Sequence, residues 1–162
     1  MDINTLFSIQ EQLNDRIIEE HQLTGQDLFQ EKLLAFIVEV GELANETRCF
    51  KYWSRKPSSE RTVILEEYVD GLHFALTLGL SLGYKNVSVK EEFDLKEKLT
   101  DHFLQVLHLA QQLNVNQLEE QFQPFMDSFF ALGHKLGFTY VEMEEAYLEK
   151  NKVNHERQDN GY

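Results

Sequence analysis

Long segments of this chain place apolar residues at intervals of three and four, and its 162 residues include only two prolines and eight glycines. That spacing gathers apolar side chains on one face of an α-helix, and the scarcity of helix breakers keeps the helices long. No segment shows a convincing alternation of apolar and polar residues, as a strand would. The pattern predicts an all-α protein, a bundle of about five to six helices. The expected helices are residues 3–21, 28–49, 60–82, 99–113, 117–136 and 140–155.

The length of 162 residues suits one ordinary domain, so we expect residues 1–162 to form a single helical domain. Thr139 and Glu142 have the spacing of a capping box, which predicts the start of the last helix. Residues 84–98 are the most polar segment and predict a loop or a mobile linker. Residues 156–162 predict a flexible polar tail.

Acidic residues outnumber basic ones, with 28 Asp plus Glu against 15 Lys plus Arg and a formal net charge of −13 at pH 7. Such a field repels the phosphates of DNA, RNA and anionic lipid, so nucleic acid polymers and membrane surfaces are poor partners. No apolar run approaches the roughly 20 residues of a membrane span. The single cysteine, Cys49, cannot form an internal disulfide. These features favour a reducing cytoplasm.

Two pairs of carboxylates lie on consecutive predicted helices. Glu39 and Glu42 form the first pair, and Glu67 and Asp70 form the second. Residues three apart share a helix face, and both pairs lie among apolar residues, so these acids should face inward. Burying ionised carboxylates together is costly unless cations compensate. An all-oxygen ligand set is typical of Mg²⁺ or Mn²⁺, so the sequence predicts a divalent-metal site, with a solvated acidic helix face as the alternative.

Glycines accompany both pairs, since Gly41 lies between the first two acids and Gly71 follows the fourth. Glycine inside a helix costs about 1 kcal/mol relative to alanine, so something should compensate. Close approach of the two helices around shared ions would do so, and so would tight packing without metal. A ferritin-like di-iron site needs two acid-x-x-His motifs, and only Asp70-x-x-His73 resembles one.

A hydrated Mg²⁺ held by carboxylates commonly completes its shell with phosphate oxygens, so this site predicts a phosphate-bearing substrate. Lys150, Asn154 and Arg157 have the spacing of one helical face at the C-terminal end and could contact such phosphates. Basic residues at a helix C-terminus are also explained by the helix dipole alone. Both interpretations stay open on spacing alone.

A nucleobase could be recognised by amides on the first helix. Gln10 and Asn14 lie four residues apart and offer both a donor and an acceptor. Trp53, with Phe50 and Lys51 beside it, could supply a stacking surface and a charge. Surface amides are common and a single tryptophan is often a packing anchor, so these residues are weak signals by themselves.

Taken together, these motifs resemble the dimeric all-α dUTPases of the all-α nucleoside triphosphate pyrophosphatase superfamily. The two acid pairs match the hallmark of the superfamily. The closer match to dUTPases rests on four segments: Leu6–Asn14, Phe50–Trp53, His73-Phe74 and the tail Lys150-Asn151-x-x-Asn154-x-x-Arg157-Gln158-x-x-Gly161-Tyr162. The resemblance covers residues 1–84 and 139–162, whereas 85–138 match only as generic helices.

The resemblance implies Mg²⁺-dependent hydrolysis of dUTP to dUMP and pyrophosphate, with Mn²⁺ as a substitute metal and dUDP as a further possible substrate. It implies that the metal ligands are Glu39, Glu42, Glu67 and Asp70. It also implies that Glu42 is the base that orients the attacking water. The implied substrate contacts are Lys150, Arg157 and Tyr162 to phosphates, Asn154 to deoxyribose, and Gln10, Asn14, Trp53 and His73 around uracil, with Lys51 nearby.

A homodimer is implied by the resemblance and by the abundance of apolar helix surface. Four phenylalanines contribute to that surface unless they belong to the core: Phe122, Phe125, Phe129 and Phe130.

Two other functions remain open. A related pyrophosphatase could act on dCTP or noncanonical nucleotides, because the amides of Gln10 and Asn14 do not uniquely dictate uracil. A non-enzymatic helical interaction protein could use its acids to bind a structural cation or a basic partner.

Overall fold

The computed structural model describes residues 1–161, and in this part of the chain it contains six helices and no strand. The predicted all-α bundle is confirmed. None of the described helices combines the length and apolarity needed to cross a membrane. The helices are α1 (Ile3–Glu20), α2 (Phe29–Thr47), α3 (Arg61–Leu82), α4 (Leu99–Asn116), α5 (Glu119–Lys135) and α6 (Tyr140–Asp159).

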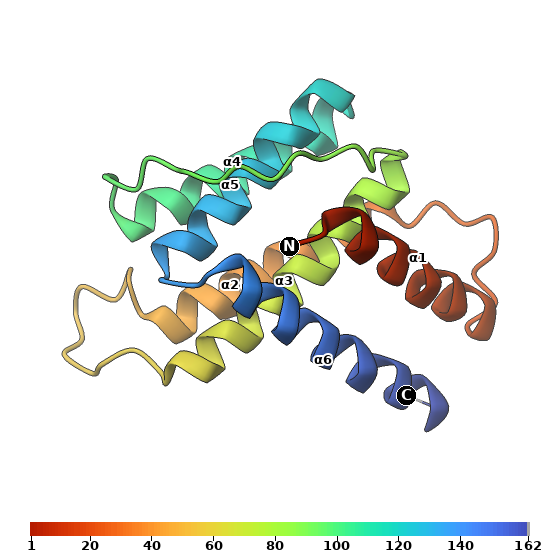
Figure 1. The fold of residues 1–162 in the computed structure, drawn as a ribbon, viewed down its shortest axis with the longest axis horizontal. Coiled ribbons are helices and arrows are strands. Elements are labelled where there is room, and N and C mark those ends of the chain that lie inside the picture. The colour runs from red at the N-terminus through yellow and green to blue at the C-terminus, as the bar shows by residue number, and fades with distance from the viewer. Residues whose placement is uncertain (162) are drawn as a thin grey trace.

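Helix α3 is the centre of the bundle, and Figure 1 shows the other helices arranged around it. It packs against α1, α2, α5 and α6, while α4 packs against α2 and α5. A helix that is apolar on most sides is stable only when it is buried, and α3 is buried along most of its C-terminal two thirds. Its position makes α3 the rigid support for Glu67, Asp70 and His73.

Helix α5 fills the core with aromatic rings. Phe122, Phe125, Phe129 and Phe130 are each at most 2% exposed. The ring of Phe129 stacks on Tyr68 of α3 with centroids 4.7 Å apart. Each buried phenylalanine contributes about 1.5–3 kcal/mol through the hydrophobic effect. The interpretation of these rings as dimer surface is therefore wrong, because they already have their partners within the chain.

The two glycines that accompany the acid pairs have different environments. A methyl group on Gly71 would lie 3.1 Å from Cζ of Phe129, so this glycine allows α5 to approach α3 closely. Gly41 on α2 is exposed, and a methyl group there would meet no atom within 4 Å. Of the two explanations that the sequence leaves open, tight packing without metal fits Gly71, which packs against α5. Neither glycine marks a close approach of α2 and α3, because Gly41 faces open space.

Residues 84–98 form neither helix nor strand, and hydrogen bonds attach them to α5 and α6. Lys135 donates from Nζ to the carbonyl of Leu95 at 2.6 Å, and the Tyr140 hydroxyl donates to the carbonyl of Lys90 at 2.7 Å. The predicted capping box of Thr139 and Glu142 is confirmed at the start of α6.

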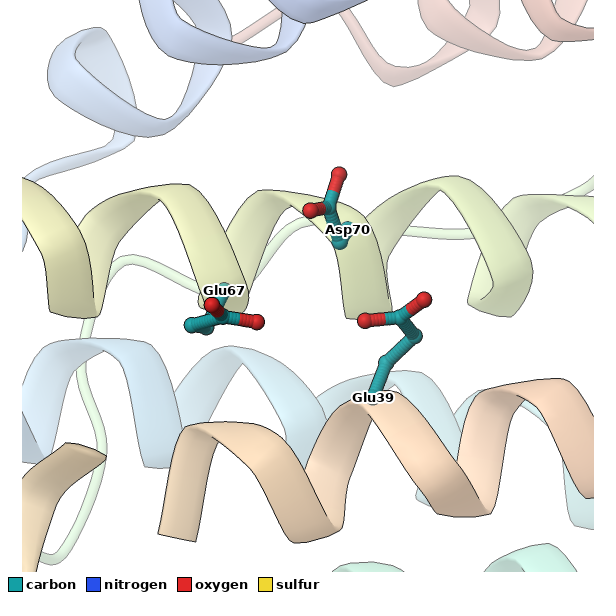
Figure 2. A group of neighbouring side chains, drawn as sticks. All are labelled: Glu39, Glu67 and Asp70. Carbon is teal, nitrogen blue, oxygen red and sulfur yellow. The ribbon is translucent and has the colours of Figure 1, made fainter. Parts of the chain in front are cut away.

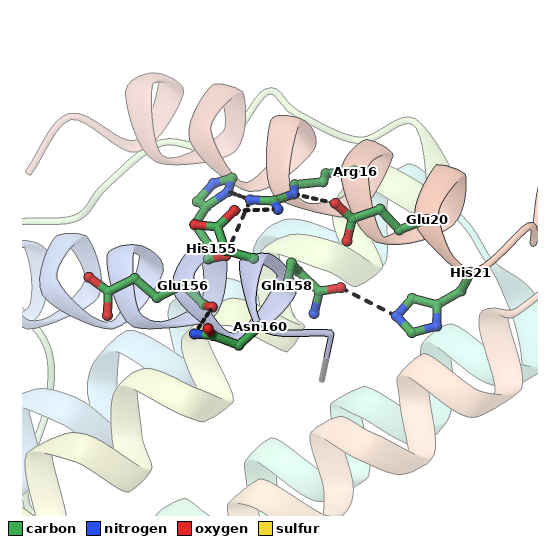
Figure 3. A network of polar contacts seen from close by, with 8 residues as sticks. Arg16, Glu20, His21, His155, Glu156, Gln158 and Asn160 are labelled. Atoms are coloured by element: carbon green, nitrogen blue, oxygen red, sulfur yellow. Dashed lines mark hydrogen bonds and ion pairs between the residues drawn. The ribbon is translucent and has the colours of Figure 1, made fainter.

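Helix α6 continues to Asp159, four residues beyond its predicted end, so residues 156–159 are helical rather than part of a tail. Helix α6 extends this far because polar contacts join its C-terminal end to the C-terminal end of α1, as Figure 3 shows. Arg16 of α1 pairs with Asp159 at 2.6 Å and donates to the carbonyl of His155 at 3.2 Å. His21 and Gln158 lie within hydrogen-bond distance at 3.3 Å. These long-range contacts hold the last turn, which no local sequence pattern reveals.

Candidate active site

Three carboxylates from two neighbouring helices meet beside the core. Glu39 projects from α2 toward Glu67 and Asp70 of α3, as Figure 2 shows. One oxygen from each carboxylate lies within 4.8 Å of the others, and all three side chains are half-buried. Three of the four acids that the sequence places on consecutive helices therefore lie close together.

Burial makes this cluster costly when all three acids are ionised. It raises the pKa of Glu39 to about 7, and the charges of Asp70, Glu42 and Glu67 add to the effect. Burial is also the main reason that the pKa values of Glu67 and Asp70 are raised. A divalent cation would compensate for this repulsion, and carboxylate oxygens are the ligands that Mg²⁺ and Mn²⁺ prefer, so the donor set fits such an ion.

Lys150 of α6 supplies a cation to the cluster. Its Nζ lies 2.8 Å from Asp70 and 3.2 Å from Glu66, and its side chain is 12% exposed. This contact lowers the pKa of Asp70, although burial acts in the opposite direction and is the larger effect. The predicted phosphate-binding lysine therefore lies against one of the predicted metal ligands.

Glu42 lies one turn beyond Glu39 on α2 and is exposed. It does not belong to the group of three close carboxylates, but its charge raises the pKa of both Glu39 and Glu67. Glu42 is therefore beside the cluster and open to solvent.

The raised pKa of Glu39 predicts that metal-free stability depends on pH. Between pH 4.5 and about 7 the unfolded chain releases a proton that folded Glu39 retains, so the free energy of unfolding falls as pH rises through this window. Glu39→Gln removes this effect. We expect the variant to be more stable than the parent by about 1 kcal/mol at pH 8, after discounting for solvent screening, and to lose that advantage below pH 4.5.

Urea denaturation in a chelator at pH 4 and pH 8 measures this difference. Glu91→Gln, in the exposed loop, is the matched control and should show no advantage at either pH. An equal stability of Glu39→Gln and the parent at pH 8 would contradict the expected burial cost.

A cavity of about 610 Å³ opens beside the cluster between α1, α2, α3 and α6. Glu39 and Asp70 of the cluster are among its lining residues. Much of the remaining wall is apolar and includes Leu13, Ile17 and Phe74. Five residues predicted as substrate contacts also line it: Gln10, Asn14, His73, Asn154 and Arg157.

A buried hydrogen-bond network orders the polar wall of this cavity. The Gln10 amide oxygen lies 2.6 Å from Nδ1 of His73 and accepts from the Tyr147 hydroxyl at 2.8 Å. Its amide nitrogen donates to Asn14 Oδ1 at 3.0 Å, and Thr77 donates to the same oxygen at 3.2 Å. With the Gln10 oxygen facing His73, Nδ1 carries the proton.

His73 is 5% exposed, and its burial lowers its pKa to about 3, with the nearby charge of Lys150 adding to this. The imidazole is therefore neutral at pH 7. Its Nε2 has no hydrogen-bond partner among the described residues. A neutral ring that donates from Nδ1 presents Nε2 as an acceptor.

Several cavity residues were not predicted from the sequence. Tyr147 stacks on His73 with centroids 4.2 Å apart. Thr77 and Lys32 line the cavity, and Thr77 also donates a hydrogen bond to Asn14. Two of them could have been found from helix spacing, because residues one turn apart share a helix face. Tyr147 lies one turn before Lys150, and Thr77 lies one turn after His73.

Two predicted substrate residues lie away from both this cavity and the carboxylate cluster, on the segment between α2 and α3. Trp53 is 65% exposed and packs edge-on against Tyr52. Lys51 donates to the Asn45 side chain and lies 5.6 Å from the ring centroid of Phe50. Tyr162, a third predicted contact, lies outside the described residues.

The fold and site together define an all-α enzyme whose acidic centre is carried on two neighbouring helices. A family model described as dUTPase matches residues 2–162, and the chain therefore belongs to the dUTPase family. It is accordingly an enzyme that hydrolyses dUTP. The match includes residues 85–138, which the sequence motifs leave as generic helices. None of the curated proteins compared with the chain matches it.

Proposed function

We propose that the chain hydrolyses dUTP to dUMP and pyrophosphate with Mg²⁺, or Mn²⁺ in its place, held by Glu39, Glu67 and Asp70, with Glu42 completing the ligand set. The observation that carries this proposal is the position of the carboxylates at one end of a cavity lined by Gln10, Asn14 and His73. The carboxylates would hold the metal beside the triphosphate, and the cavity would accept the nucleoside. When bound, the metal supplies positive charge that stabilises the charge developing during phosphoanhydride cleavage.

The cationic side chains of α6 bind the phosphates in this proposal. Lys150 lies against Asp70, and its ammonium group would be free for a phosphate oxygen when Asp70 holds a divalent ion. The charge of Arg157 also lowers the pKa of Asp70. Arg157 and Asn154 both line the cavity. Tyr162 remains a proposed phosphate contact, and Asn154 a proposed contact to deoxyribose.

Glu42 is the proposed catalytic base. It is exposed and one turn from Glu39, so water can reach it beside the acids. Its carboxylate would orient the attacking water and accept its proton, while the bond between the α-phosphate and the pyrophosphate group breaks. No serine, cysteine or histidine nucleophile is needed for this reaction.

A nucleotide panel distinguishes the possible substrates. We expect release of pyrophosphate from dUTP to exceed that from dCTP and from noncanonical triphosphates, with dUDP as a secondary substrate. Equal rates on dUTP and dCTP would favour the pyrophosphatase of broader specificity. No product from any nucleotide would favour a helical interaction protein whose acids bind a structural cation or a basic partner.

We also propose that the enzyme acts in the cytoplasm. The single cysteine, Cys49, is free and suits a reducing compartment.

A homodimer is proposed on the basis of an apolar surface on two packed helices. Leu34 and Val38 of α2 and Leu104 of α4 are 62%, 48% and 64% exposed. The exposed Gly41 lies on α2 one turn beyond Val38, where a second helix could approach. A second copy could also bring Lys51 and Trp53 to a substrate, since these residues lie outside the cavity of their own chain.

Placing charges on this surface should separate the two copies. We expect the Leu34→Asp/Val38→Asp variant to scatter light as a monomer of 19.1 kDa, and the parent protein to show twice that mass. Val141→Asp, which changes a valine 60% exposed on α6, is the matched control and should stay dimeric. A monomeric parent protein with intact activity would refute the dimer.

A further inference from the structure

Lys32 lies at the far end of the cavity from the carboxylates. Its Nζ donates to the Ser81 hydroxyl at 2.9 Å, and its side chain is half-buried along the cavity wall. Among the described residues it forms no salt bridge with a carboxylate. Burial lowers the pKa of this lysine, and only the charge of Asp27 opposes that effect. A half-buried ammonium group therefore has hydrogen-bond donors left for a ligand.

The position of Lys32 along the cavity relates it to the carboxylates. It precedes Glu39 by seven residues on α2, so the two side chains share a helix face and lie about 10 Å apart along the axis. On α3 the order is Asp70, His73, Thr77 and Ser81, so Ser81 and Lys32 mark one end and the acids mark the other. A nucleotide with its phosphates at the acids would therefore extend its base toward Lys32.

The cavity wall around this end is mostly apolar, and the nearby charges besides Lys32 are Glu31, which also lines the cavity, and Asp27, whose charge acts on the lysine. Leu28 and Ile18 line it, together with Phe74 and the polar side chains of Asn14 and Thr77. A hydrogen bond from a cation is stronger in such surroundings than in water. The chemical group that such a cation selects is an electron-rich oxygen.

We propose that Lys32 is a specificity-determining residue whose ammonium group, positioned by Ser81, donates to the C4 carbonyl oxygen of a pyrimidine base. Uracil has an oxygen at this position, whereas cytosine has an amino group whose hydrogens would face the cation. This inference rests on the proposed function, because it takes the phosphates to lie at the carboxylates. It goes further in assigning the choice between uracil and cytosine to a residue on α2.

The role of Lys32 concerns the preference for dUTP over dCTP and leaves the preference for dUTP over dTTP to other residues. Thymine carries the same C4 oxygen as uracil, so Lys32 should not affect the preference for dUTP over dTTP. A variant that only damaged the cavity would change both preferences, whereas loss of this donor should change only the preference for dUTP over dCTP.

Lys32→Met keeps the apolar stem and removes the donor. We expect it to lower the ratio of kcat/KM for dUTP to that for dCTP by about tenfold or more, with the ratio for dUTP to dTTP unchanged. Lys32→Arg, which retains a donor, should recover part of the selectivity. Lys85→Met is the matched control, because Lys85 is exposed and pairs with Glu11 on the surface of α1.

Calorimetric binding of dUMP and dCMP gives a second measurement that needs no catalysis. The parent protein should prefer dUMP, and Lys32→Met should lose that preference while keeping a native circular dichroism spectrum. An unchanged preference in Lys32→Met, or no preference in the parent protein, would overturn the assignment. Failure of the parent protein to hydrolyse dUTP would instead contradict the proposed function, and the binding experiment would still decide the role of Lys32.

Discussion

Asp70→Asn should lower the rate of dUTP hydrolysis by about a hundredfold or more, because a cation held by the carboxylates stabilises the transition state by several kcal/mol. Asp70 is the acid that links the carboxylate cluster to both the cavity and Lys150. An amide at this position keeps the shape of the side chain but lacks the charge. Steady-state kinetics over a range of Mg²⁺ concentrations should show weaker activation by the metal as well as a lower maximal rate.

Glu66→Gln is the matched control for this variant. Glu66 lies on the same helix and also contacts Lys150, at 3.2 Å, but it is exposed and outside the carboxylate cluster. We expect its activity to stay within about threefold of the parent protein, as is usual for an exposed ion pair. Comparable losses in the two variants would show that contact with Lys150, rather than metal ligation, explains the effect of Asp70→Asn.

Glu42→Gln should lower kcat by about a hundredfold or more with a smaller change in KM. A general base typically contributes a factor of about 10²–10⁴, and its loss affects the chemical step more than substrate binding. The carboxamide cannot accept the proton from water, but it retains an oxygen that can still coordinate a cation. Rapid-quench measurement of a single turnover checks that the chemical step itself is slower.

Glu46→Gln tests whether any nearby charge has the same effect. Glu46 lies one turn beyond Glu42 on α2 and accepts a hydrogen bond from the Ser59 hydroxyl, which a glutamine oxygen can also accept. Its kcat should therefore remain close to that of the parent protein. If Glu42→Gln also retained full kcat, Glu42 would not be the base.

Much of the helical fold could be predicted because amphipathic spacing is a local property. The starts and ends of α1 to α5 lie within about three residues of the predicted limits. The end of α6 could not be predicted, because its last turn depends on contacts between Asp159 and Arg16, far away in the sequence. The four phenylalanines of α5 posed a similar difficulty, since the same apolar spacing suits a core and an interface between copies.

In the candidate site, too, local helix spacing could be predicted and contacts between distant segments could not. Glu39, Glu67 and Asp70 could be grouped from the sequence because helix spacing fixes which side chains share a face. Lys32 was missed, because a lysine on an amphipathic helix has the ordinary pattern of a solvent-facing residue, and only packing of α2 against α3 places it near Ser81. Trp53 lies in a segment without helical periodicity, so spacing could not relate it to the cavity.

The measurement that tests the account most directly is pyrophosphate release from dUTP by the intact chain, with Mg²⁺ and with a chelator in its place. We expect equimolar dUMP and pyrophosphate in Mg²⁺, no product above background in the chelator, and recovery when Mg²⁺ or Mn²⁺ is restored. Hydrolysis that continues unchanged in the chelator, or that fails in Mg²⁺ with a folded protein, would contradict a metal-dependent dUTPase centred on Glu39, Glu67 and Asp70.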